Sequence, residues 1–454
     1  MSKFFPSLQA LVGAERVSGW EAIAPALKAQ LFQAIAPAVA LEQDVPDGLP
    51  ECVVQPDTPA QLAAIVKQLH QEKGRSLSFG SGSKLHWGGL AQGVQVGIST
   101  ARLNRLIDHA AGDLTVTAQS GMRLADLQAH LAQQNQFLPL NPSYSDAATL
   151  GGIIATADSG SLRHRYGGVR DLLIGITFVR ADGEIAKAGG RVVKNVAGYD
   201  LMKLFTGSWG TLGILSEVTF RVYPLPEASK TLVLTGEKKA TPEQISSQIA
   251  RVTQALLASA LTPAAVELVA APAMQQLGQD GLGLVVQFQG LAVALDAQTE
   301  QLRQFGQAAG VAATVYTDDA ETALWQRLAK GWEASTPSPV LTCKIGVLPN
   351  QAATTLAKIT TLYPSLTYGA IHAGSGLGQL RFDADLPSAS SILELRRLCE
   401  AQGGFLSLLA APTDVKQQID PWGYPGNALD LMRGIKQQFD PDALLSPGRF
   451  VGGI

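Results

Sequence analysis

The residue types best suited to chemistry in this 454-residue chain gather in one stretch, "SFGSGSKLHWGG", at residues 78–89. Its glycines let the backbone turn through conformations that are closed to other residues, and they bring backbone N–H groups close to an anion. A pyrophosphate would suit such a loop. The alternative is a glycine-rich surface turn. The residues that would bind the anion are Gly80, Ser81, Gly82, Ser83 and Lys84.

This loop fails both common nucleotide-binding patterns. A dinucleotide-binding fingerprint needs a third glycine, but Leu85 stands at that place. A Walker loop needs Gly-Lys-Ser/Thr, which Ser83-Lys84-Leu85 does not supply. Only the general capacity of exposed amides to hold phosphate remains as an argument for binding.

A second segment, "SDAATLGGIIATADSG" at residues 145–160, places Thr149 before the pair Gly151 and Gly152. Small residues there permit close approach of the backbone to a planar or phosphorylated ligand. Tight packing of a helix on a sheet is the alternative. Farther along, Asp200 is expected to cap a short helix at residues 201–205, followed by a glycine-rich turn into a strand.

Composition excludes several classes of function. The net charge of −3 and the pI near 6.1 provide no broad basic surface, which argues against binding of nucleic acid or of a membrane through basic residues. The three cysteines form no CxxC pair, so they predict neither an iron–sulfur cluster nor a zinc site. No apolar run long enough to span a bilayer and no secretory signal is found, which favours a cytoplasmic protein without direct membrane insertion.

Periodicity predicts the elements that position these segments. Residues 59–73 have the pattern of an amphipathic helix with Thr58 as its cap, and a strand at 76–79 follows. A hairpin with a type I′ turn at Asp182-Gly183 is expected, and prolines at 224 and 226 suggest a domain boundary. The expected divisions are a helical leader at 1–45, a first domain at 46–225, an α+β domain at 226–425 and a returning helix and tail at 426–454.

These motifs together carry a family resemblance. The order of the two glycine-rich segments, "YGGVRDLLIGITFVRADGEI", "KNVAGYDLMKLFTGSWGTLGILSEVTFRVYP" and "LLSPGRF" resembles the FAD-binding proteins of the vanillyl-alcohol oxidase and p-cresol methylhydroxylase (PCMH) type. Within that family the chain is similar to the E subunits of glycolate oxidase, also called glycolate dehydrogenase. The resemblance is strongest at residues 46–225 and returns in the C-terminal motifs.

The resemblance implies an α+β protein with a PCMH-type FAD-binding domain of two α/β subdomains and an α+β cap. The FAD pyrophosphate would lie on residues 80–84 and 149–152, with charge added by Lys84, and the strand from Gly213 and Ile214 would line the adenine and flavin side. In relatives with covalent flavin, a histidine directly follows the glycine pair. His86 lies farther along, so non-covalent FAD is expected.

The chain also departs from the family. Relatives that oxidise D-2-hydroxy acids carry a His-Gly-Glu-His motif that is missing here, so no metal site is expected. His164 is expected to be a solvated loop residue and Arg449 to tie the tail to the first domain. The remaining catalytic candidates are Lys344 and Arg381, either of which could bind a carboxylate, and His372, which could accept a proton. Solvated strand residues and a packed turn histidine are the alternative.

The resemblance implies three alternative functions. In the first, the chain is an FAD-binding subunit that passes electrons from glycolate to an iron–sulfur partner, while a paralogous flavin subunit abstracts the hydride. In the second, it is a self-sufficient D-2-hydroxy-acid dehydrogenase. In the third, it is an assembly subunit without cofactor. The expected location is the cytoplasm, with membrane association through partners.

Overall fold

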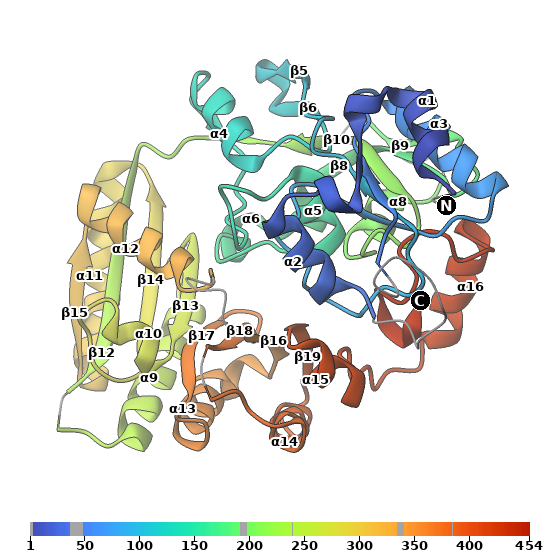
Figure 1. The fold of residues 1–454 in the computed structure, drawn as a ribbon. Helices are drawn as coiled ribbons and strands as arrows, with labels where there is room; N and C mark the ends of the chain where they lie inside the picture. The colour runs from blue at the N-terminus through green and yellow to red at the C-terminus, as the bar shows by residue number, and fades with distance from the viewer. Residues whose placement is uncertain (1–2, 37–48, 191–197, 238, 334–339, 384) are drawn as a thin grey trace. The chain divides into compact units, whose positions relative to one another are not determined.

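The computed structural model describes residues 3–36, 49–190, 198–237, 239–333, 340–383 and 385–454. Its contacts divide the chain into two compact units (Figure 1). The first unit contains residues 1–159, 168–224 and 424–454, and the second contains 160–167 and 225–423. The divisions near 225 and 424 lie close to the expected ones, whereas the assignment of 160–167 to the second unit has no counterpart in the sequence-based division.

The first sheet of the first unit has four strands and is covered by a helix that the sequence predicts. That helix, α3 (Pro59–Gln71), begins at Thr58, whose side chain accepts a hydrogen bond from the Gln61 N–H at 3.1 Å. Its apolar face packs into the core of the sheet. The strand order is β1 (Val17–Gly19), β2 (Cys52–Val54), β4 (Val96–Ser99) and β3 (Ser76–Phe79), with parallel pairing except between β1 and β2.

The N-terminal segment is part of this sheet, so the prediction of a leader is wrong. Strand β1 pairs antiparallel with β2, with Val17 opposite Val54. Phe4 and Leu8 are fully buried in the same core. The prediction failed because strand pairing joins residues far apart in sequence, which helical periodicity cannot reveal. The helices of this segment are α1 (Phe5–Val12) and α2 (Pro25–Ala34), and residues 37–45 of the expected leader lie outside the described residues.

The second sheet of the first unit has five antiparallel strands, which share one core with the helices around them. The strand order is β5 (Leu106–Ala110), β6 (Thr115–Gln119), β10 (Ile214–Arg221), β8 (Leu173–Val179) and β9 (Ile185–Gly189). The helices are α4 (Leu124–Ala132), α5 (Leu150–Thr156), α7 (Val169–Leu172), α8 (Leu201–Phe205) and α16 (Leu429–Phe439), and a small ribbon joins β7 (Gln136–Phe137) to β11 (Tyr223–Pro224).

The predicted hairpin of β8 and β9 is present, but its turn differs from the prediction. A type I′ turn requires positive φ at both central residues, whereas Gly183 (φ +86°) has a positive φ and Asp182 does not. The Gly183 N–H donates to the Arg180 carbonyl at 3.0 Å. The turn therefore ends on a left-handed glycine, the arrangement typical of a longer hairpin loop.

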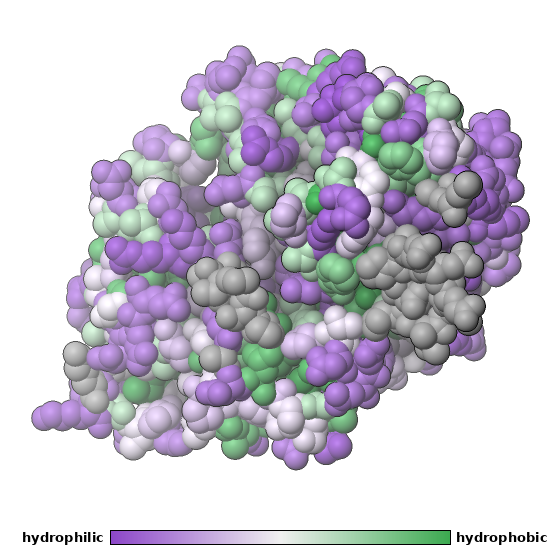
Figure 2. Space-filling model, viewed as in Figure 1, coloured by the Kyte–Doolittle hydropathy of each residue, from purple (hydrophilic) through white to green (hydrophobic). Residues whose placement is uncertain are grey.

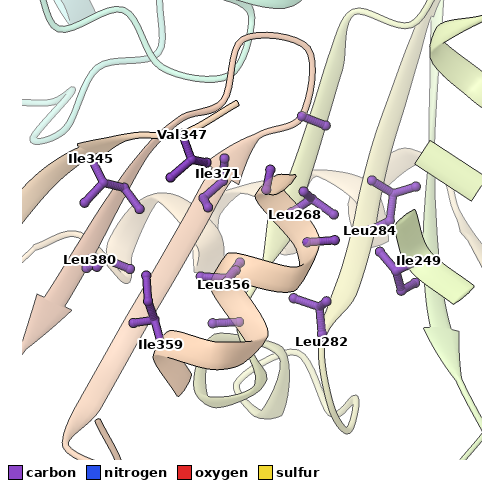
Figure 3. Packing of buried hydrophobic residues seen from close by; sticks show 14 of the residues in the cluster. Ile249, Leu268, Leu282, Leu284, Ile345, Val347, Leu356, Ile359, Ile371 and Leu380 are labelled. Atoms are coloured by element: carbon purple, nitrogen blue, oxygen red, sulfur yellow. The ribbon is translucent and has the colours of Figure 1, made fainter. Parts of the chain in front are cut away.

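The second unit is an eight-stranded antiparallel sheet whose core lies under four helices. Figure 3 shows Ile249, Leu356 and Ile359 of these helices packed against strand residues such as Leu268 and Leu380. The strand order is β15 (Val311–Tyr316), β12 (Ala228–Gly236), β14 (Gly283–Gly290), β13 (Ala265–Val269), β17 (Leu366–His372), β18 (Leu377–Phe382), β16 (Leu341–Gly346) and β19 (Phe405–Ala410). The four helices are α9 (Pro242–Leu257), α11 (Ala292–Ala309), α13 (Ala352–Leu362) and α14 (Ala389–Glu400).

The opposite face of this sheet carries a smaller apolar cluster and most of the unit's buried polar side chains. Residues alternate between the two faces along each strand. Ile371 and Leu380 therefore belong to the large core, while Tyr368, His372 and Arg381 face the other way. The helices α10 (Ala271–Gln275) and α12 (Asp318–Lys330) pack on this second face, and α6 (Arg163–Tyr166) and α15 (Thr413–Gln418) complete the described helices of the unit.

Figure 2 shows that the viewed surface is mainly hydrophilic, with hydrophobic residues in small separate groups. Among the described helices none has the length and apolar character needed to cross a bilayer.

Candidate functional site

The two glycine-rich segments meet at one cleft in the first unit. The Ser81 hydroxyl donates to the Ala147 carbonyl at 2.6 Å. Gly80 approaches Thr149 so closely that a Cβ on Gly80 would lie 2.0 Å from the Thr149 Oγ1. No side chain fits at residue 80 without moving Thr149, so glycine is required there by the contact between the two segments.

The first segment forms a turn with free amides after strand β3. The Leu85 N–H donates to the Gly82 carbonyl at 2.9 Å, and Gly82 adopts a positive φ of +84°, a conformation that favours glycine. The N–H groups of Ser81, Gly82 and Ser83 donate to no group of another described residue. Since these residues line the cleft and their N–H groups have no partner among the described residues, this turn can hold an anion.

The second segment lines the cleft in a different way. The Gly151 N–H donates to the Ser120 carbonyl at 2.7 Å, and the Gly152 N–H donates to the Thr149 Oγ1 at 3.3 Å as part of the N-cap of α5. A Cβ on Gly151 would lie 3.0 Å from the Ser120 Cβ. These amides are already used, so the segment contributes a smooth wall, and the alternative of close packing holds at Gly151.

The strand that leaves the third glycine-rich turn supplies another wall. Gly213 lies against Phe178, where a Cβ would be 3.0 Å from the ring, and Ile214 begins β10. Trp209 adopts a positive φ of +56° and packs its ring on Gly88. Asp200 caps α8 as expected, although residues 194–197 of this motif lie outside the described residues.

The cleft encloses about 830 Å³ of empty space, part of it open to solvent, which is within the range of ligand pockets. Every predicted cofactor residue lines it: Gly80, Ser81, Gly82, Ser83, Lys84, Thr149, Gly151, Gly152, Gly213 and Ile214. His86 is not among the described lining residues, and its ring lies 6.1 Å from that of Tyr144.

Lys84 and Arg449 are the charged residues among the described ones that line the cleft. The Lys84 Nζ lies 2.6 Å from the Asp158 Oδ2, and both side chains are buried. Asp158 is therefore a counter-ion for Lys84, although the buried Lys84 Nζ makes no hydrogen bond of normal geometry to a described residue. That Lys84 adds charge at the phosphates stays a prediction. Sequence reasoning missed this pair because Asp158, which follows the C-terminal end of α5, is far from Lys84 in the sequence. Arg449 donates to the carbonyls of Gly89 and Leu85, at 2.7 and 2.9 Å.

In the second unit His372 is hydrogen-bonded through both ring nitrogens. Its Nδ1 accepts from the Ser375 N–H at 3.1 Å, so the ring proton of the neutral side chain is on Nε2, which lies 3.2 Å from the His164 Nδ1. Burial, together with His164 and Arg163, lowers the pKa of His372 to about 3. A histidine held neutral in this way is a poor acceptor for the proton of a substrate hydroxyl.

His164 is not the solvated loop residue that the sequence suggested. Its ring is partly buried, and burial lowers its pKa. Glu267 stands opposite His372 in the register of β13 and β17. Burial raises the pKa of Glu267 above its usual range, an effect that Arg163 opposes. These neighbours of His372 come from two other parts of the chain, residues 163–164 and residue 267, and no local signal could have joined them.

The other two catalytic candidates lie on the same face of the sheet. Arg381 is almost fully buried, and its guanidinium binds the Asp383 carboxylate at 2.6 Å and the Gly331 carbonyl at 3.3 Å. The alternative of a solvated strand residue is therefore wrong for Arg381, and its role as a catalytic residue stays a prediction. Lys344 lies opposite Gln379 and Ser407 in the strand register and is only partly buried. The structure places the three candidates on one face, but only Lys344 retains partial exposure.

Within the described residues no group of three or more His, Cys, Asp or Glu side chains could hold a metal ion. The three cysteines are buried thiols.

Comparison with known families assigns the chain to a class. Residues 50–189 match the family described as "FAD binding domain", and residues 417–450 match "FAD linked oxidases, C-terminal domain". The N–H groups of residues 81–83 are available to the diphosphate of a dinucleotide, and Gly80 lets the two glycine-rich segments meet around it. The chain is an FAD-dependent oxidoreductase with FAD as its cofactor, and its two matched segments are similar to those of FAD-linked oxidases.

Curated relatives narrow the comparison. The chain is 26% identical to the glycolate oxidase subunit GlcD of Bacillus subtilis, over 88% of this chain and 89% of that protein. It is 26% identical to a D-2-hydroxyglutarate dehydrogenase of Xanthomonas citri over the same shares. It is 35% identical to the glycolate oxidase subunit GlcE of Escherichia coli, over 37% of this chain and 49% of that protein. The chain therefore covers only about half of that last relative.

Solved structures confirm the PCMH-type fold. p-Cresol methylhydroxylase superposes with a TM-score of 0.70 at 15% identity, covering 98% of this chain and 96% of that one. A glucooligosaccharide oxidase of Acremonium strictum gives a TM-score of 0.70 at 16% identity, with both chains fully covered. At these identities the likeness concerns the fold alone.

Proposed function

We propose that this protein is the FAD-binding subunit of a dehydrogenase complex that oxidises glycolate or a similar small 2-hydroxy acid. Electrons would pass through its FAD to an iron–sulfur partner, and a paralogous flavin subunit would abstract the hydride. The observation that carries the proposal is the convergence of the glycine-rich segments on one cleft. The similarity to glycolate oxidase subunits GlcD and GlcE supports the substrate class.

The chain's own residues would hold the cofactor. The N–H groups of Ser81, Gly82 and Ser83 would bind the diphosphate, and the wall at Gly151 and Gly152 would permit its close approach. Gly213 and Ile214 would line the adenine and flavin side of the cleft. FAD supplies a two-electron acceptor for the oxidation of an alcohol. We infer non-covalent binding, because His86 lies outside the described lining of the cleft.

The polar face of the second unit supports the role of a partner in catalysis. Lys344 could bind the carboxylate of a 2-hydroxy acid. Proton abstraction needs a free base, however, and both nitrogens of His372 are engaged. Arg381 is bound to Asp383, so it is not available to a second carboxylate without losing that contact. The proposed complex would reside in the cytoplasm and reach a membrane through its partners.

A self-sufficient D-2-hydroxy-acid dehydrogenase is the second candidate. It is favoured by the match to a D-2-hydroxyglutarate dehydrogenase, which extends over 88% of this chain. In that case Lys344, His372 and Arg381 would form the substrate site. An assembly subunit without cofactor is disfavoured by the unfilled amides of the cleft.

The test is to purify the chain alone, record its visible spectrum and add glycolate without oxygen. We expect a yellow protein that stays oxidised until the partner subunits are added. Bleaching of the isolated chain by glycolate, D-lactate or D-2-hydroxyglutarate would select the self-sufficient enzyme. A colourless protein that takes up no FAD would refute both.

A further inference from the structure

Of the two charged side chains described at the cleft, one has a carboxylate as counter-ion and the other does not. Lys84 is paired with Asp158 at 2.6 Å. The Arg449 guanidinium forms no ion pair with a carboxylate of any described residue. It donates to two backbone carbonyls and lies 5.9 Å from the centre of the Trp209 ring. Arg449 is 4% exposed. A buried charge without a counter-ion is unfavourable, so the cleft carries an unsatisfied requirement for an anion.

The guanidinium has donors to spare. Its five N–H groups exceed the two that bind the carbonyls of Leu85 and Gly89. Burial lowers the pKa of Arg449 to about 10, which leaves the side chain positively charged at neutral pH. The residue can therefore hold the backbone and bind an anion at the same time.

The position of Arg449 connects it to the free amides. It binds the Leu85 carbonyl, and the Leu85 N–H donates to the Gly82 carbonyl. The guanidinium thus lies at the end of the turn whose N–H groups at 81–83 have no described partner. A planar guanidinium that presents several donors binds phosphate oxygens better than an ammonium group does.

We propose that Arg449 is the cation that binds the diphosphate of FAD, the role that the sequence suggested for Lys84. The proposal rests on the location of FAD in this cleft, as given under Proposed function. Lys84 acts instead as a positioning residue, because its pair with Asp158 joins the first glycine-rich turn to the end of α5. Arg449 both closes the turn and supplies its charge.

The test compares Arg449→Gln with Arg449→Lys in the full chain stripped of FAD. Dissociation constants are measured for FAD and for ADP, which carries the diphosphate without the flavin ring. We expect Arg449→Gln to weaken both ligands by about 10- to 100-fold, as loss of a charged hydrogen bond does. Arg449→Lys keeps the charge, so it should weaken them less. An unchanged affinity for ADP in Arg449→Gln would overturn the proposal.

The midpoint potential of bound FAD is a second readout. The diphosphate has the same charge in oxidised and reduced FAD, so the potential should not change in Arg449→Gln. A lowered potential with unchanged ADP binding would assign the charge to the flavin ring instead and reject the proposal. The affinity of the wild-type protein for ADP should fall with rising salt, and this dependence should be weaker in Arg449→Gln.

A merely structural role is tested by thermal unfolding of the stripped protein. Both variants lose part of the fork that binds Leu85 and Gly89, so both should unfold at lower temperature. Equal losses of ADP affinity in the two variants would show that Arg449 acts only through its hydrogen bonds to Leu85 and Gly89, and would reject the proposal. The comparison variant is the double change Lys84→Met with Asp158→Asn, which removes both charges of the pair and should affect ADP less than Arg449→Gln does. A wild-type chain that binds no FAD would refute the proposed function itself, whereas normal binding by Arg449→Gln would refute this inference alone.

Discussion

The cleft of the first unit presents mainly backbone groups, whereas the polar sheet face of the second unit presents side chains. The cleft presents backbone: amides at residues 81–83 without described partners, and glycines that leave room. The polar face presents side chains that already bind one another, such as His372 with His164 and Arg381 with Asp383. The first is prepared for a ligand from outside, and the second is largely satisfied within itself. Binding capacity therefore lies where polar groups are left over, rather than where charged residues are most numerous.

The largest expected effect is at Gly80. In Gly80→Ala the added Cβ would meet the Thr149 Oγ1, so the two segments must separate. We expect the affinity for FAD to fall by about 100-fold or more. Fluorescence titration of the stripped protein with FAD measures this. The control is Gly112→Ala, in the same unit, where a Cβ meets nothing within 4 Å. Equal affinities for FAD in Gly80→Ala and in the control would show that FAD does not bind between the two glycine-rich segments.

A second change tests how the tail supports the cleft. The Lys436 Nζ donates to the Thr211 carbonyl at 2.8 Å and to the Leu445 carbonyl at 3.0 Å, and it pairs with the buried Asp440. Lys436→Met leaves this carboxylate without its counter-ion, which costs about 3 kcal/mol in the free energy of unfolding. Urea denaturation measures the loss. Adding Asp440→Asn should restore part of it, and a loss that the second change deepens would contradict the ion-pair explanation.

A third change tests whether His372 on the polar face is held neutral by its buried surroundings. His372 stays neutral in the folded chain, with a pKa of about 3, whereas in the unfolded chain it binds a proton below pH 6.5. Its contribution to stability is therefore complete above pH 6.5 and is lost as the pH falls. Between pH 6.5 and 5 the loss is about 2 kcal/mol.

The measurement compares wild type with His372→Gln by urea unfolding at pH 6.5 and at pH 5. The difference in unfolding free energy should change by about 2 kcal/mol in favour of the variant at the lower pH, because glutamine does not titrate. A difference that is the same at both pH values would show that His372 is not buried as a neutral group.

The smallest effect is expected at Arg381. Arg381→Lys keeps the charge but gives up the fork that binds Asp383 and the Gly331 carbonyl, so stability should fall by about 1 kcal/mol. Thermal unfolding checks this, with glycolate kinetics of the assembled complex measured alongside. A large rise in KM with unchanged stability would make Arg381 a substrate residue and would break the contrast between the two regions. Lys344→Met is the companion variant: KM should stay unchanged if the partner subunit binds glycolate, and a rise would place the substrate in this chain and favour the self-sufficient enzyme.

The sequence predicted features that depend on neighbouring residues. The Thr58 cap and Pro59 defined α3, and Asp200 defined the start of α8. The glycine spacing predicted the cleft because a backbone site is made of consecutive residues. The pairing of β1 with β2 and that of Lys84 with Asp158 escaped prediction, because each joins segments that only the folded chain brings together.

The candidate catalytic residues illustrate the same limit. The sequence could place His372 and Arg381 near the ends of strands, but not their partners. His164 belongs to residues 160–167, a short excursion of the chain into the second unit. Side-chain chemistry depends on such long-range neighbours, and a residue's type alone does not show whether its hydrogen bonds are already made.

The order of the units along the chain has a consequence for biosynthesis. Residues 424–454, which carry Lys436, Asp440 and Arg449, follow the whole second unit in the chain but belong to the first. A ribosome therefore completes the second unit before it has made Arg449, which lines the cleft of the first unit. If Arg449 binds the diphosphate, we expect tight binding of FAD only after the last residues of the chain have left the ribosome.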